Sequence, residues 1–461
     1  MTSKRASKSP PDGGWGWLVV LASFLAQTLN AECMFAMGVF IPPLTSYFGA
    51  DLVEVSTVFS ITISLCCFVA PFSSFLDKYG TRRVVTAGGL ITTSGLIASS
   101  FATSVYYLWF SYGFLVGLGQ GMVYAPMFSV LGMYFKRYLG LASSLALTGV
   151  GVGYMAFSPI HQLLLDAYGW RGCFLVMAAI NANLFVCAAL VRPIEVTITT
   201  NQEAEDLKKV YTQKSRSPER NCMKLCCKVT TNESLGCGFV FRTRSFIFVL
   251  LGEALSTLTY ATTALFIVPC VIEKGIPSLS ASLLMSTVGI ASLVARLFSA
   301  ACMDLSCLHN SRKFIPTLSM WILGTFFICF PFSSRFVIMV IFCAVIGLAQ
   351  GFYYPSMWLL VNSVTGRNYT MAVGLTLFFA GIGCVIGPPL GGFLYDVTKN
   401  YKVTFPAVGS GNILSGLLLL IAALRHQPTK NDDKTPEDLS PVEDTERLVE
   451  LEIMEFRVST V

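Results

Sequence analysis

The stretch Gly117–Tyr124, GLGQGMVY, returns 230 residues later as Gly347–Tyr354, GLAQGFYY. The same shift continues without a gap through matched glycines, prolines and aspartates further along the chain: Gly151 and Gly381, Gly153 and Gly383, Pro159 and Pro389, Asp166 and Asp396. One such match arises easily by chance, but a series of them in one register does not. The sequence therefore predicts two halves of similar structure that follow each other in the chain.

Both copies of this repeat lie in long apolar runs. Hydrophobic residues make up 54% of the 461 residues and charged residues only 13%, whereas soluble domains usually carry about 25% charged residues. A helix needs roughly 20 mostly apolar residues to cross the ~30 Å hydrocarbon core of a bilayer. Twelve runs meet this requirement, centred near residues 28, 65, 94, 118, 150, 181, 258, 292, 322, 348, 383 and 415. We therefore expect an all-α membrane protein with 12 transmembrane helices in two pseudo-symmetric six-helix bundles.

The basic residues are distributed unevenly between the two sides of such an arrangement. With the N-terminus inside, 26 of the 32 Lys and Arg residues fall on the inner side and five on the outer side. This bias matches the positive-inside rule, so we expect both termini in the cytoplasm and the protein in the plasma membrane. The expected divisions are a cytoplasmic N-terminal tail (1–13), a first six-helix bundle (14–193), a cytoplasmic linker (194–245), a second bundle (246–425) and an acidic, disordered cytoplasmic tail (426–461).

The loop between the second and third runs reads Asp77-Lys78-Tyr79-Gly80-Thr81-Arg82-Arg83. It resembles the loop signature of the major facilitator superfamily, whose members contain two parallel six-helix repeats. An Asp at one helix end and Arg residues at the start of the next helix form a charge lock that would hold the halves closed on the cytoplasmic side. The other interpretation is a solvated loop whose arginines, Arg82 and Arg83, serve only membrane topology.

The first apolar run opens with Asp12-Gly13-Gly14-Trp15-Gly16-Trp17. This string resembles the helix-1 signature of the monocarboxylate transporter family, and further matches extend over roughly residues 11–425. A second family signature, at the start of the fifth run, is matched only in part. Paired Trp residues are also typical of interfacial anchors, while small residues let helices approach and slide. We assign conformational roles to residues of both signatures: Asp12, Trp15, Trp17, Arg137, Gly149 and Gly153.

Ionisable residues inside membrane helices are costly and usually functional, and three lie within the apolar runs: Glu32, Glu253 and Arg296. The resemblance implies that Arg296 pairs with the carboxylate of the substrate. A guanidinium suits this role because its planar fork donates two parallel hydrogen bonds to a carboxylate. The alternative is an arginine held in a structural ion pair with Glu253 or Glu32.

Two positions depart from the family pattern. Family members that move lactate with a proton carry an Asp one helical turn before the arginine, where this chain has Ser292. They also carry a Lys in the outer half of helix 1, where the ungapped alignment places Phe35. The chain therefore resembles the divergent branches of the family, which move larger or zwitterionic carboxylates, often without a proton.

One hypothesis is that Arg296 holds the carboxylate of a zwitterion while Glu32 or Glu253 faces its cationic end, as an amino acid, a betaine or a guanidino acid would allow. Alternatively, one Glu carries a proton in place of the missing Asp. A third interpretation places Glu32 near the outer interface, in contact with water. We expect His161, like the other histidines, at a solvated helix end.

Polar side chains of the repeated stretch form a further set of candidates. The set occupies paired positions in helices 4 and 10: Gln120, Tyr124, Gln350, Tyr353 and Tyr354. They would line the central cavity and contribute to the substrate site, together with Ser292, or they would form hydrogen bonds that pack helices.

These expectations combine into a secondary transporter that moves a small carboxylate-bearing organic solute by alternating access, facilitative rather than proton-coupled. Two alternatives stay open: a carboxylate sensor or assembly partner with little transport, and a proton-linked lactate/pyruvate symporter. The sequence contains no nucleophile–base pair, metal-ligand cluster or phosphate loop, so we expect no enzyme activity, cofactor or metal. We expect no nucleic-acid binding either, because membrane topology explains the net charge of +6.

Partners beyond the substrate and the lipid bilayer are suggested by two features. The family resemblance raises a single-pass accessory glycoprotein as a partner. The chain ends in Ser459-Thr460-Val461, and a hydroxyl residue two positions before a terminal Val fits capture by a PDZ domain.

Overall fold

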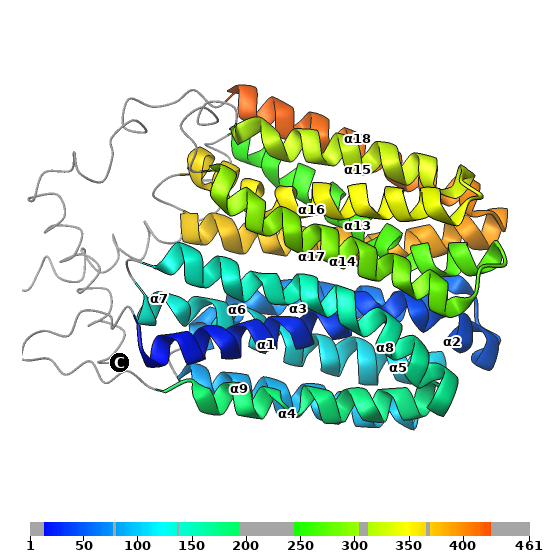
Figure 1. Ribbon diagram of the computed structural model, residues 1–461, viewed down its shortest axis with the longest axis horizontal. Helices are drawn as coiled ribbons and strands as arrows, with labels where there is room; N and C mark the ends of the chain where they lie inside the picture. Colours follow the sequence, from blue (N-terminus) through cyan, green and yellow to red (C-terminus); the bar gives the residue numbers. More distant parts are fainter. Residues whose placement is uncertain are drawn as a thin grey trace, which may run out of the picture.

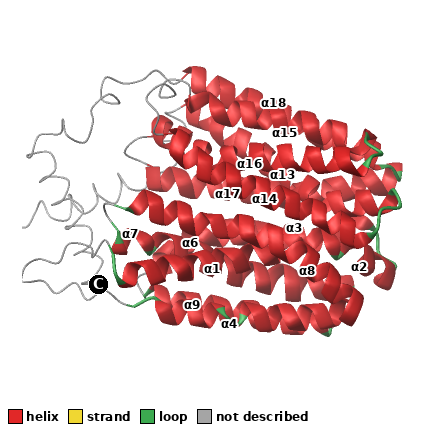
Figure 2. Ribbon diagram, viewed as in Figure 1, coloured by secondary structure: helices red, strands yellow, loops and turns green. Residues whose placement is uncertain are grey.

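The computed structural model describes residues 13–76, 80–135, 138–192, 244–303, 312–365 and 369–425. Throughout these ranges the regular structure is helical (Figure 2). The first half contains α1 (Trp15–Phe35), η1 (Ala36–Val39), α2 (Ile41–Phe48), α3 (Leu52–Leu76), α4 (Thr81–Ser100), α5 (Val105–Leu108), η3 (Trp109–Val116), α6 (Gly117–Ser129), α7 (Leu131–Tyr134), α8 (Leu139–Asn181) and α9 (Leu184–Leu190). The second half contains α13 (Arg244–Glu273), α14 (Ser278–Met303), η5 (Arg312–Phe314), α15 (Ile315–Cys329), η6 (Phe330–Phe332), α16 (Phe336–Thr365), α17 (Tyr369–Thr398) and α18 (Tyr401–Arg425).

Twelve membrane crossings can be traced through these helices. Ten segments are long and apolar enough to span a bilayer, and one of them, Gly140–Leu190, is 51 residues long. That segment is two crossings, because Gly169 has φ 65° and ψ 177° and breaks α8. The twelfth crossing is α4, which is 20 residues long but rich in Thr, Ser and Gly. The predicted fold, all-α with two six-helix bundles, is confirmed.

The two halves form adjacent stacks of nearly parallel helices (Figure 1). Their most extensive contacts join α3 to α17 and α8 to α14, and η1 adds a smaller contact with α13. Serine hydroxyls fix these seams by donating to backbone carbonyls of the opposite half. Ser60 donates to Cys384 O at 2.7 Å, and Ser286 donates to Met155 O at 2.7 Å.

Close helix approach within each half depends on glycines spaced four residues apart. A Cβ added to Gly149 or Gly153 of α8 would collide with Phe24 O or Thr28 O of α1. The second half repeats the arrangement, because Gly383 and Gly387 of α17 lie against carbonyls of α13, those of Ala254 and Leu258. Stripes of small residues allow such close backbone contact between membrane helices.

The repeat and this packing differ by one helical turn. The 230-residue shift carries Gly153 to Gly383 and Phe24 to Ala254. In the structure, however, Gly383 meets the carbonyl of Ala254, whereas the residue that meets Phe24 is Gly149. A stripe with glycine at every fourth position presents the same surface after a slide of one turn, so the two halves pack equivalently in different registers.

Replacing Gly383 by Ala tests this packing. The added methyl group would overlap Ala254 O and force α17 away from α13, and overpacking of this kind costs about 1–3 kcal/mol. We expect a lower apparent melting temperature of the purified protein in detergent. Gly132→Ala is the matched control, because nothing lies within 4 Å of a Cβ there. Equal melting temperatures for the two variants would contradict the role of the glycine stripe.

Candidate functional site

The helix-1 signature anchors the start of α1 within the first half. Trp15 Nε1 donates to Leu190 O at 2.9 Å, and the Arg192 guanidinium lies 3.5 Å from the Trp15 ring centroid. Trp17 packs edge-on against Phe135, with ring centroids 5.1 Å apart. A Cβ on Gly16, between the two Trp residues, would lie 2.9 Å from the Phe135 ring. The signature therefore fastens α1 to the end of α9 and to the residue after α7.

The predicted cytoplasmic charge lock stays a prediction. Arg82 and Arg83 lie in the first turn of α4 with exposed side chains. Asp77, the proposed partner, lies outside the described residues, as do Asp12 and Arg137.

Arg296 of α14 lies at the seam between the halves. Its Nη1 donates to Leu147 O of α8 at 3.1 Å, and its guanidinium carbon lies 5.7 Å from the ring centroid of Tyr354. Tyr260 and Tyr124 are also close enough to interact with its charge. Its buried Nε has no hydrogen-bond partner among the described residues.

Neither membrane carboxylate forms an ion pair with Arg296, so the structural ion pair considered from the sequence is absent. Glu253 of α13 accepts a hydrogen bond of 2.5 Å from Tyr353 and one of 3.4 Å from Ser256. Glu32 instead contacts His161 of α8 at 3.3 Å. Arg296 is therefore partly buried without a neutralising side chain from the described chain.

The repeated glycine stretch explains why Tyr354 lies over Arg296. A Cβ added to Gly351 of α16 would lie 2.5 Å from Ser292 O and 3.2 Å from Arg296 N. This glycine therefore lets α16 pack directly on the turn of α14 that carries the arginine. Tyr354 follows Gly351 by three residues and reaches the guanidinium from the same helix. Ser292 is buried at this contact, with 2% of its surface exposed.

Aromatic hydroxyls from both halves complete this region. The hydroxyl of Tyr154 in α8 contacts that of Tyr260 in α13, which links the halves beside Arg296. Gln350 of α16 lies beside Tyr260 and is 2% exposed. Tyr124 of α6 is partly buried, and its backbone carbonyl accepts a hydrogen bond from Gln27 at 3.3 Å. The structure thus places Tyr124, Gln350 and Tyr354 near Arg296, and their part in substrate binding stays a prediction.

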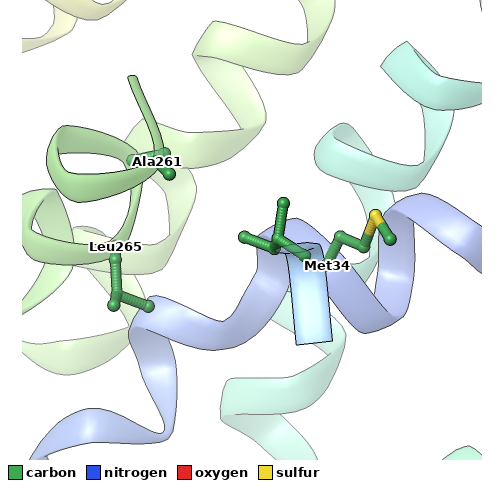
Figure 3. A pocket seen from close by; sticks show the side chains of 5 residues that line it. Met34, Ala261 and Leu265 are labelled. Atoms are coloured by element: carbon green, nitrogen blue, oxygen red, sulfur yellow. The ribbon is translucent and has the colours of Figure 1, made fainter. Parts of the chain in front are cut away.

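A small apolar pocket lies between the halves. It is lined by side chains of α1, α3 and α13: Met34, Ile63, Ala261, Ala264 and Leu265. Figure 3 shows Ala261 and Leu265 on one helix of the second half, beside the helix of the first half that carries Met34. This lining offers no partner for a carboxylate, so the pocket is not the anion site.

Glu32 and His161 are placed differently from the sequence-based expectation. Both side chains are 0% exposed, so the predictions of a wet Glu32 and a solvated His161 are wrong. Helix α8 continues to the break at Gly169, which puts His161 two turns inside the helix. Asn181 completes the cluster by donating to Glu32 Oε2 at 3.1 Å.

The model of the Major Facilitator Superfamily matches residues 17–305 and 249–456. The chain belongs to the Major Facilitator Superfamily. It is 29% identical to "Monocarboxylate transporter 12" of Rattus norvegicus over 91% of this chain and 87% of that protein. It is also 29% identical to "Monocarboxylate transporter 2" of Mesocricetus auratus over 89% of this chain and 84% of that protein. The resemblance to monocarboxylate transporters is confirmed.

A solved structure shows the same superfamily fold. A mutant of the peptide transporter POT in complex with sulfate superposes with a TM-score of 0.68, covering 88% of this chain and 94% of that one. At 15% sequence identity this likeness concerns the fold alone. Like its relatives, the chain is a multi-pass membrane protein of a transporter superfamily.

Sequence reasoning missed three residues of this region. Tyr154 and Tyr260 sit in apolar runs without a distinctive spacing, so only the packed halves reveal their contact. Asn181 was part of a long apolar run. A polar amide in such a run was the available signal, because buried polar groups require partners.

Replacing Gly351 by Ala tests the geometry around Arg296. The methyl group would push α16 from α14 and move Tyr354 away from the guanidinium. We expect roughly tenfold weaker uptake of a carboxylate substrate, about the value of one charge-assisted hydrogen bond. Gly374→Ala is the control, because its Cβ would meet only Pro71 at 3.6 Å. Initial uptake rates in proteoliposomes, corrected for reconstituted protein, measure the effect, and equal rates would contradict it.

Proposed function

We propose that the chain is a secondary transporter that moves a small carboxylate-bearing organic solute across the plasma membrane by alternating access. The observation that carries the proposal is Arg296, a guanidinium at the seam of the two halves without a carboxylate partner from the described chain. An unneutralised cation in a membrane protein is costly. A carboxylate substrate supplies the missing charge.

The chemistry of the surroundings favours an organic carboxylate over a simple ion. A guanidinium offers five donors in a rigid fork, and in the present state Nη1 donates to Leu147 O while Nε has no partner. A substrate carboxylate can accept from Nε and from the terminal nitrogen on the same edge of the guanidinium. The rings of Tyr354, Tyr260 and Tyr124 would contact the organic part of the substrate and offer hydroxyl groups.

The residue one helical turn before Arg296 bears on whether a proton moves together with the substrate. Ser292 occupies the place one helical turn earlier on α14, and a serine carries no exchangeable charge. The Arg296 site therefore lacks the acid one turn away that could exchange a proton when a carboxylate binds. Transport through this site alone is facilitative.

The cationic end of a zwitterionic substrate would face Glu253 rather than Glu32. Glu253 interacts electrostatically with Tyr354, which lies over Arg296. Its Oε2 accepts from Tyr353 at 2.5 Å, so this hydroxyl must turn away before a substrate cation can approach that oxygen. Glu32 is engaged by His161 and Asn181 in the first half.

Alternating access requires the contacts between the halves to open in turn. Arg296 donates to α8, and the hydroxyls of Tyr154 and Tyr260 meet across the same seam. A carboxylate that binds the guanidinium in place of Leu147 O removes the hydrogen bond between α14 and α8. Substrate binding thereby weakens the closed seam.

Arg296→Leu should strongly reduce this function. Loss of charge-assisted hydrogen bonds worth about 1.5–3 kcal/mol each weakens carboxylate binding by about tenfold to a hundredfold. Arg296→Lys keeps the charge but not the fork, so we expect an intermediate loss. The measurement is uptake of labelled lactate, alanine, betaine and guanidinoacetate into oocytes, with surface expression quantified.

Arg335→Leu serves as the control, because it removes an exposed arginine just before α16. Its uptake should equal that of the unmodified protein. Undiminished uptake by Arg296→Leu of any solute in the panel that the unmodified protein transports would overturn the assignment of Arg296.

A further inference from the structure

The first half contains a buried acid–histidine pair that the Arg296 site does not use. Glu32 Oε1 lies 3.3 Å from His161 Nε2, and both side chains have no exposed surface. Asn181 Nδ2 donates to Glu32 Oε2 at 3.1 Å. The second ring nitrogen, His161 Nδ1, is buried and has no hydrogen-bond partner among the described residues.

The charge of this pair depends on one proton. With an ionised Glu32 and a neutral His161 that donates from Nε2, the pair carries one net negative charge inside the membrane. Adding a proton to the free Nδ1, or to the carboxylate, gives a pair without net charge. Burial of an uncompensated charge is costly. With the added proton on Nδ1, Asn181 still donates to Glu32 Oε2 and His161 Nε2 still donates to Oε1.

The groups that face the pair do not compensate the negative charge. The titratable ones are neutral acids, two of them on the helices of the pair itself: Cys33 of α1, Cys173 of α8 and Tyr112 of η3. Tyr112 Oη donates to Cys33 O at 2.9 Å, and the Cys33 thiol contacts Asn181 Oδ1 at 3.6 Å. Among the described residues, His161 is the sole group able to bring a positive charge to Glu32.

We propose that the Glu32–His161 pair binds the proton that this transporter couples to substrate movement. The proposal rests on the proposed transport function and adds a coupling ion to it. One proton is taken from water on one side and bound at the pair, and the same proton returns to water on the other side. No electrons move and no other bond changes.

The pair is placed to sense the opening of the halves. His161 contacts Glu32 of α1 and packs edge-on against Phe40, with ring centroids 5.5 Å apart. Between these two residues lies η1, and a Cβ on its Gly38 would be 2.7 Å from Leu265 O of the other half. Movement of η1 away from α13 must therefore disturb the contacts of His161. This gives the proton a route to water that depends on the state of the transporter.

A hydrogen-bonded chain also joins the pair to the repeated stretch. Gln120 Nε2 donates to Asn181 Oδ1 at 3.2 Å, and Asn30 Nδ2 donates to Gln120 Oε1 at 3.0 Å. Gln120 matches Gln350, which lies beside Tyr260 near Arg296. The first half thus uses this position for the proton pair, and the second half uses it for the substrate.

The test compares unmodified protein with Glu32→Gln and His161→Gln in proteoliposomes that contain a pH-sensitive dye. The probes are labelled lactate, alanine, betaine and guanidinoacetate. For the unmodified protein we expect an inward proton gradient to raise substrate accumulation at least threefold, and substrate entry to carry protons inward. Both variants should lose this coupling but keep substrate exchange, because exchange needs no proton release. Glu54→Gln, at the start of α3, is the matched control and should keep both.

The failures of the two proposals can be told apart. Substrate flux that needs Arg296 but ignores the proton gradient would overturn the proton site and leave the proposed function intact. Proton-driven accumulation by Glu32→Gln equal to that of the unmodified protein would also overturn it. If no probe is transported, infrared titration of the purified protein decides. A carboxyl or imidazole band that titrates in the unmodified protein and is missing in both variants supports the proton site. The absence of such a band from the unmodified protein overturns the proton site.

Discussion

Burying a guanidinium inside a membrane protein requires an anion, water or a set of acceptors around it. Arg296 has only part of such a set: one carbonyl from the opposite half, the ring of Tyr354 and the nearby hydroxyls of Tyr260 and Tyr124. Its Nε has no partner among the described residues. The two membrane carboxylates that would neutralise it are engaged elsewhere, Glu253 by Tyr353 and Glu32 by His161. The arrangement keeps a positive charge available at the seam where the halves must separate.

Close helix packing positions this charge. Gly351 brings α16 onto the turn of α14 that carries Arg296, and the matching glycine of the first half, Gly121, brings α6 onto α3 at Val69. The glycine of this stretch therefore packs helices in both halves, while other residues of the stretch differ in function. Tyr354 faces the guanidinium, whereas Gln120 joins the buried network of Glu32 and Asn181. A repeated backbone plan thus supports two unlike polar sites.

The fold was predictable because its signals are collective. Run length, charge asymmetry and the repeat each average over many residues, so the break at Gly169 and the polar character of α4 changed none of the twelve crossings. The neighbourhood of Arg296 was predictable in part, through the resemblance and the paired positions of Tyr124, Gln350 and Tyr354. The environments of Glu32 and His161 were not, since depth along a helix does not reveal which neighbouring helix covers a given face. The one-turn offset between Gly153 and Gly383 was hidden for a related reason: a four-residue stripe looks the same in both registers.

The central claim is that Arg296 recognises a carboxylate, and matched pairs of ligands test it most directly. Purified protein is titrated with each acid of the panel and with its neutral amide, and the shift in melting temperature is recorded. A ligand that binds the folded state raises that temperature in proportion to its affinity and concentration. The account predicts that at least one acid stabilises the protein, that its amide does not, and that Arg296→Leu abolishes the difference. Equal stabilisation by acid and amide would contradict it.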